Sequence, residues 1–153
     1  STPPRELDFP SHFPAPLMRK KWERWIGEGE EGRMVFRVRG GSMGLANRLG
    51  RSAQDKVCKS CNTGSVEDEV HMLLVCSGYV NERRRMIQRL KKLWGMERFG
   101  EWVLKDHEGS FLELVGLEGK ETVGLASIVG ASAKEMLEIR QARSCLGSGL
   151  GEE

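Results

Sequence analysis

Three cysteines and one histidine within nineteen residues constrain this 153-residue chain more than any other feature of its sequence. Cys58, Cys61, His71 and Cys76 form the pattern C-x2-C-x9-H-x4-C. Zn²⁺ takes four tetrahedral nitrogen and sulfur ligands, and a C-x2-C pair supplies two of them from one tight turn. Because all four ligand positions would be filled, the pattern predicts a structural zinc site with no position for a reactive water. The alternative is a set of small buried residues beside a core histidine.

The spacing of the second ligand pair also predicts a local change in backbone. His71 and Cys76 are five residues apart, which is about 500° around an α-helix, so their side chains would diverge by about 140°. A helix carrying His71 must therefore loosen or end between Leu74 and Cys76. Lys56 lies just before the first pair and Lys59 lies within it, and both should favour thiolates. Cys145 lies far from the pattern and is interpreted as an ordinary free cysteine.

Helical apolar spacing and the ligand pattern together predict a mainly α fold of short helices around a CCHC zinc knuckle, with disordered termini and at most a small strand near Met34–Val38. Hydrophobic residues make up 39% and charged residues 30% of the chain, and no apolar run approaches the ~20 residues of a membrane span. The N-terminus carries no secretion signal, so the cysteines are expected in a reducing compartment, nuclear or cytoplasmic. Since the first Met is Met18, we expect a piece of a longer chain.

Proline, glycine and charge divide the chain into five predicted segments. All five prolines lie within the first sixteen residues, which is typical of a linker. The segments are a Pro-rich linker (1–16), basic lead-in helices and loop (17–57), the CCHC knuckle with a basic helix (58–94), a C-terminal helical segment (95–146) and a frayed tail (147–153).

Five helices follow from apolar periodicity and capping residues. They are a short basic helix over Leu17–Ile26 ended by Gly27, a helix over Val66–Val75 capped by Ser65, a helix over Val80–Trp94, a short helix opened by Ser110 and closed by Gly116, and a last helix over Glu121–Arg143. The predicted apolar stripe of the Val80–Trp94 helix is Val80, Met86, Ile87, Leu90, Leu93 and Trp94. That of the last helix is Leu125, Val129, Ala133, Met136 and Leu137.

The charge is distributed unevenly along the chain. Residues 1–96 hold 18 Lys and Arg against 11 Asp and Glu, whereas residues 97–153 hold 6 against 11. Residues 82–92 alone carry six basic side chains and one acid, which predicts an anionic partner such as RNA or DNA. The candidate nucleic-acid-binding residues are Lys56, Lys59, Tyr79, Arg83, Arg84, Arg85, Arg89, Lys91 and Lys92. The alternatives are that the arginines form only a solvated helix face and that Tyr79 packs beside the metal.

Residues 58–79 resemble the C-terminal cysteine/histidine module of reverse transcriptases from non-LTR (LINE-type) retrotransposons. That family's pattern is C-x2-C, a turn, then E-D-E-x-H-x-L-L-x-C-x-x-Y and a basic helix. The matching residues are Glu67, Asp68, Glu69, His71, Leu73, Leu74, Cys76 and Tyr79. The resemblance extends loosely over residues 33–143 and implies a module, beyond a polymerase domain, that grips template RNA or target DNA.

Catalysis is not expected of this chain. It has no F/Y-x-D-D polymerase motif, and no proline after residue 16 that a P-D…E-x-K nuclease motif would need. Our first hypothesis is a non-catalytic zinc module that binds RNA or DNA. The second is a zinc-stabilised module that docks on a polymerase domain of the same polyprotein or on another protein. A fragment without present function is the third. Neither a membrane nor a small-molecule substrate is an expected partner.

Overall fold

Helices form nearly all the regular secondary structure of the protein. The structure is a computed structural model that describes residues 29–117 and 123–151. The α-helices are α2 (Gly29–Arg39), α3 (Val80–Trp94), α4 (Met96–Val103), α5 (His107–Leu114) and α6 (Val123–Gly151), with short η2 (Gln54–Lys56), η3 (His71–Val75) and η4 (Ser77–Tyr79) between α2 and α3. Within the described ranges there is no strand, only an isolated antiparallel bridge between Val57 and Val66. The mainly α prediction is confirmed. The predicted linker and the helix at residues 17–26 lie outside the described residues.

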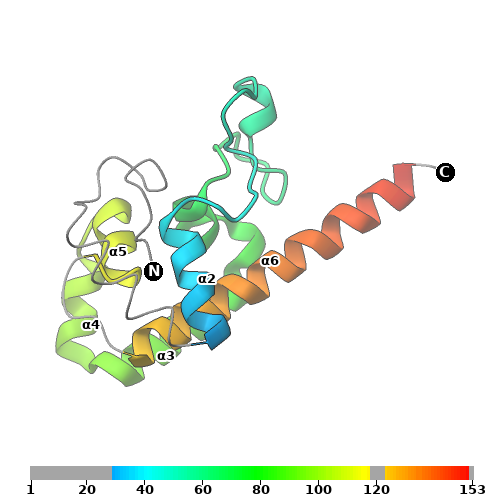
Figure 1. Ribbon diagram of the computed structural model, residues 1–153. Coiled ribbons are helices and arrows are strands. Elements are labelled where there is room, and N and C mark those ends of the chain that lie inside the picture. Colours follow the sequence, from blue (N-terminus) through cyan, green and yellow to red (C-terminus); the bar gives the residue numbers. More distant parts are fainter. Residues whose placement is uncertain (1–28, 118–122, 152–153) are drawn as a thin grey trace, which may run out of the picture.

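Helix α6 is the element against which the others pack. It crosses the molecule diagonally, with α2 and α3 against its first half and its last turns extending beyond the rest (Figure 1). All five residues of its predicted apolar stripe are buried. The helix continues to Gly151, past Arg143, where it was predicted to end, and past Gly147, where a frayed tail was predicted.

Residues 34–38 are helical, so the small strand that the sequence allowed there does not form. Met34, Val35 and Val38 are buried, and their i, i+1, i+4 spacing is that of one helix face. Of the two basic residues that alternate with apolar ones, Arg37 is exposed but Arg39 is buried and donates to the Val115 carbonyl at 3.3 Å. The sequence pattern fitted a strand and a helix equally well, but burial does not alternate along it. Packing against α6 selects the helix.

Helix α3 has the predicted bounds, but its buried face is narrower than predicted. Met86 and Leu90 are completely buried, whereas Val80 and Leu93 are 47% and 40% exposed. The reason is that α6 covers one side of α3, and the two ends of the predicted stripe lie beyond that contact. Trp94 packs against Trp102 of α4, with 5.7 Å between ring centroids.

Helix α5 begins at His107, three residues before the predicted start. The carboxylate of Asp106 accepts a hydrogen bond from the Gly109 N–H at 2.7 Å, so Asp106 is the N-cap. Ser110 lies inside the helix, where its hydroxyl donates to the Trp102 carbonyl. No helix in the described part of the chain is long and apolar enough to span a bilayer.

Candidate metal centre

The four predicted ligands converge. The Sγ atoms of Cys58, Cys61 and Cys76 and a ring nitrogen of His71 all lie within 4.8 Å of one another, and all four residues are buried. The sulfurs of Cys58 and Cys76 are 3.7 Å apart, and Cys61 Sγ lies 3.3 Å from His71 Nε2. A disulfide would need about 2.05 Å between sulfurs, and the three cysteines are free. This group could therefore hold a metal ion.

The first ligand pair lies in a loop whose ends are tied together by backbone hydrogen bonds. Cys58 N–H donates to the Ser65 carbonyl and Glu67 N–H donates to the Lys56 carbonyl, both at 2.8 Å. Gly64 adopts a φ of +78° within the turn, a conformation that favours glycine. These bonds form the Val57–Val66 bridge and close the loop that carries Cys58 and Cys61, residues 57–66, which we call the ligand loop.

The second pair lies on a helical turn that widens, as the spacing predicted. Cys76 N–H donates to the His71 carbonyl five residues earlier, at 2.7 Å, so His71–Val75 is a π-turn. Cys76 then turns to an extended conformation, with ψ of 125°. The wider turn brings Cys76 onto the side that His71 faces, which an ideal α-helix would not do.

The predicted start of this helix is wrong by several residues. Regular helix begins at Glu69 rather than at Val66, because Asp68 is the cap. Its carboxylate accepts a hydrogen bond from the His71 N–H at 2.8 Å, the N-cap to third-residue contact. Ser65, the predicted cap, hydrogen-bonds Thr63 instead.

Arg83, predicted to bind nucleic acid, holds the end of this turn. Its guanidinium donates to the carbonyls of Leu73 at 2.8 Å, Met72 at 3.0 Å and Cys76 at 2.7 Å. These carbonyls lie at the C-terminal end of the helical turn, where no helical N–H follows to pair them. Burial lowers the pKa of Arg83. Through these three bonds the Nε and Nη2 donors of Arg83 hold the turn between His71 and Cys76, and nucleic-acid binding by this side chain stays a prediction.

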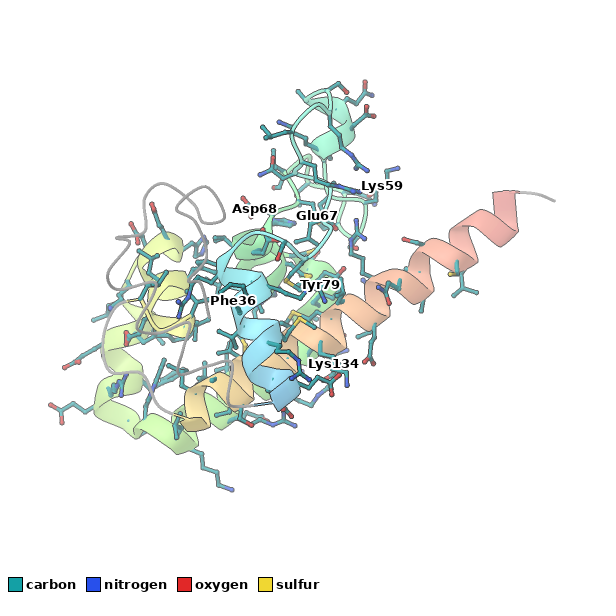
Figure 2. All side chains as sticks on the ribbon, viewed as in Figure 1. Phe36, Lys59, Glu67, Asp68, Tyr79 and Lys134 are labelled. Carbon is teal, nitrogen blue, oxygen red and sulfur yellow. The ribbon has the colours of Figure 1, made fainter. Side chains whose placement is uncertain are left out.

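Glu67 anchors the ligand loop to α6. Its carboxylate accepts two hydrogen bonds from Arg140, at 2.8 and 2.9 Å, and one from the Ala46 N–H at 2.8 Å. Burial alone would raise the pKa of Glu67, but the hydrogen bonds from Arg140 and Ala46 lower it below its ordinary value of 4.5. Figure 2 shows Glu67 between the upper loop and α6.

Tyr79, the other predicted aromatic contact, is completely buried. Its hydroxyl shares a 3.2 Å hydrogen bond with Ser60, and the Arg143 guanidinium lies 5.1 Å from its ring centroid. Arg143 also donates to the Gly78 carbonyl at 2.7 Å. A ring enclosed in this way packs beside the metal ligands, which is the alternative that the sequence had left open, and its faces are not available to a base.

The thiols differ in their ease of ionisation. A hydrogen bond from the Thr63 hydroxyl lowers the pKa of Cys61 to about 6. Burial raises the pKa of Cys76 to about 12. Cys61 therefore ionises more readily than Cys76, and a cation would be needed to ionise Cys76 near neutral pH.

The remaining predicted nucleic-acid-binding residues lie at the surface. Lys59 is exposed at the outer side of the ligand loop (Figure 2), and Lys56 is half-buried. Arg84, Arg89 and Lys92 are exposed along α3. Two others have partners within the molecule: Arg85 pairs with Glu135, and Lys91 Nζ lies 5.1 Å from the ring centroid of Phe99.

Residues that support the ligands were only partly visible in the sequence. Glu67 is part of the pattern that the sequence shares with the LINE-type module it resembles, but its partner Arg140 is 73 residues away. The i, i+3 spacing of Arg140 and Arg143 places both on one face of α6. This spacing is the sequence signal that could have identified them as a pair of supporting residues. No known protein family, curated protein sequence or solved structure matches this chain.

Proposed function

We propose that this protein is a non-catalytic, zinc-stabilised module that binds RNA or DNA. The observation that carries the proposal is the convergence of one imidazole and three buried sulfurs. Two thiolates at zinc, each about 2.3 Å from the ion, are about 3.8 Å apart in a tetrahedral site. The 3.7 Å between Cys58 and Cys76 supports that geometry.

Zinc would have a structural role in this module. Three thiolates and an imidazole complete its tetrahedral shell, so no position is left for a water to be activated. The segment that it would hold, residues 40–70, contains only one 3-10 turn, the start of one helical turn and an isolated bridge. Because this segment has little regular secondary structure, we expect the ion to fix the conformation of the part that carries the ligands.

Exposed basic side chains support nucleic acid as the partner. Arg84, Arg89 and Lys92 on α3 and Lys59 on the ligand loop have no ion-pair partner among the described residues. Cations of this kind bind phosphates and release counterions from the nucleic acid. The resemblance to the cysteine/histidine module of LINE-type reverse transcriptases supports the same partner.

The test combines metal analysis with binding. Native mass spectrometry should find one zinc per chain. Fluorescence anisotropy with a 20-nucleotide single-stranded RNA, and separately a DNA of the same sequence, should give an affinity that falls steeply between 50 and 200 mM salt. No zinc, or no binding to either strand at 50 mM salt with zinc bound, would contradict the proposal.

Exposed apolar side chains favour a second candidate, docking on a polymerase domain of the same polyprotein or on another protein. Leu93, Met96, Val103 and Leu104 are 40 to 88% exposed around α4. Isolated exposed apolar residues are common, but several on neighbouring turns are typical of an interaction site. Met96→Ser/Leu104→Ser should abolish docking and leave RNA affinity unchanged if this candidate is right.

A further inference from the structure

The ligand loop and the outer half of α6 enclose a cleft, of whose lining only Lys59 entered the proposed function. It has a volume of about 530 Å³, within the range of ligand-binding clefts. Its charged lining residues are Arg51, Lys59, Arg140, Arg143, Asp55 and Glu67. Arg140 and Glu67 neutralise one another through their paired hydrogen bonds. Three cations then remain against the single carboxylate of Asp55.

The three remaining cations are placed to bind an anion. Arg51 and Lys59 are exposed and have no ion-pair partner among the described residues. Arg143 is held in place by its hydrogen bond to the Gly78 carbonyl and by its contact with the Tyr79 ring. A cation that is already positioned loses less conformational freedom on binding. A concave surface lined by one sign of charge also concentrates its field.

We propose that this cleft binds the phosphate backbone of a nucleic acid strand, with Arg51, Lys59 and Arg143 as the phosphate contacts. The proposal rests on the proposed function and names its binding surface. Arginine and lysine are the side chains that bind phosphate. The hydroxyls of Ser60 and Ser144, which also line the cleft, add neutral donors. No aromatic side chain lines it, so the contact is to backbone phosphates rather than to bases.

The cleft also explains why zinc would matter for binding. Lys59 lies between the ligands Cys58 and Cys61, and Ser60 hydrogen-bonds Tyr79. One wall of the cleft is therefore the metal-binding loop itself, and the opposite wall is α6. Loss of the ion would release the first wall and disperse the three cations.

The experiment compares two pairs of substitutions in the zinc-loaded full chain. Arg51→Gln/Lys59→Gln removes two cleft charges, and Arg33→Gln/Arg37→Gln removes two exposed charges from α2 as a matched control. With the 20-nucleotide RNA, the cleft pair should weaken binding about tenfold and reduce the salt slope by about 1.4, the loss of two single-strand phosphate contacts. The control pair should change the affinity less than twofold.

Each contrary result has a distinct meaning. Equal weakening by both pairs would overturn the cleft proposal and leave nucleic-acid binding in place, since only net charge would then matter. A wild-type chain that binds no RNA or DNA at 50 mM salt would overturn the proposed function and the cleft with it. Displacement of the RNA by micromolar adenosine monophosphate would show a mononucleotide pocket and overturn the backbone assignment.

Discussion

Arg83 shows how one side chain outside the ligand set can control a metal site. Its three hydrogen bonds to the π-turn carbonyls fix the backbone between His71 and Cys76. Arg83→Met should cost about 2 kcal/mol of unfolding free energy, because charge-assisted bonds to otherwise unpaired carbonyls are lost. It should also weaken zinc binding about tenfold, as loss of an outer support does. Urea unfolding and competition with a chromophoric chelator measure the two effects. Arg84→Met, on the exposed side of α3, should change neither.

The pair of Glu67 and Arg140 gives the module a predictable response to acid. Glu67→Gln should lower the unfolding free energy at pH 7 by about 2 kcal/mol, because Arg140 loses its charged partner. The pKa of Glu67 is lower in the folded state than its ordinary 4.5. Its stabilisation is therefore complete above pH 4.5 and is lost as the pH falls through the lower folded value. Urea unfolding curves of the wild type and the variant should thus converge below pH 4.5. A difference that stayed constant down to pH 3 would contradict this assignment.

Gly130 determines how closely α2 and α6 approach. A Cβ added to Gly130 would lie 2.7 Å from the Cα and carbonyl carbon of Glu31 and closer still to its carbonyl oxygen. Gly130→Ala must therefore move α2 away from α6, with an expected loss of about 2–3 kcal/mol of unfolding free energy, as for other overpacked sites.

Gly100 is the matched control, because it lies in α4 with nothing within 4 Å of an added Cβ. Gly100→Ala should instead stabilise the protein by about 0.5–1 kcal/mol, through helix propensity. Thermal unfolding compares the two; a neutral Gly130→Ala would contradict the close packing.

Among the elements, long periodic segments were predicted well and short ones were not. The bounds of α3 and the buried stripe of α6 follow from local apolar spacing, which needs no knowledge of the fold. Whether Met34–Val38 is a strand or a helix depends on the partner that covers it, and α6 lies about 90 residues away. The same reason explains Gly130, which in the sequence only weakens a helix but in the fold is the point where two helices touch. The cap at Asp68 was misplaced because Ser65 and Asp68 both have side chains suited to capping.

At the scale of the whole molecule, the ligand set was predictable because it is local, and its supports were not because they are distant. Four ligands within nineteen residues constrain one another through chain length alone. Arg140 and Arg143 join the site only when α6 folds back across the loop that carries Glu67 and Ser60 (Figure 1). The ligand loop, α6 and Arg83 of α3, which hydrogen-bonds the π-turn, therefore form one connected unit. Disturbing the metal should affect this unit before it affects the contact between α2 and α6.

The reactivity of the four cysteine thiols can show whether the metal site is lost before the helices come apart. Cys145 is exposed, whereas Cys58, Cys61 and Cys76 are buried in the ligand cluster. With zinc bound, a thiol reagent such as DTNB should therefore modify one cysteine per chain, and after zinc is removed by EDTA it should modify four. Far-UV circular dichroism should lose only a minor part of its helical signal, because Leu90, Val129 and Met136 keep α3 and α6 packed. Cys145→Ser is the control and should give none and then three. Rapid modification of all four cysteines in protein supplied with one equivalent of zinc would show that no ion is held by the three buried sulfurs.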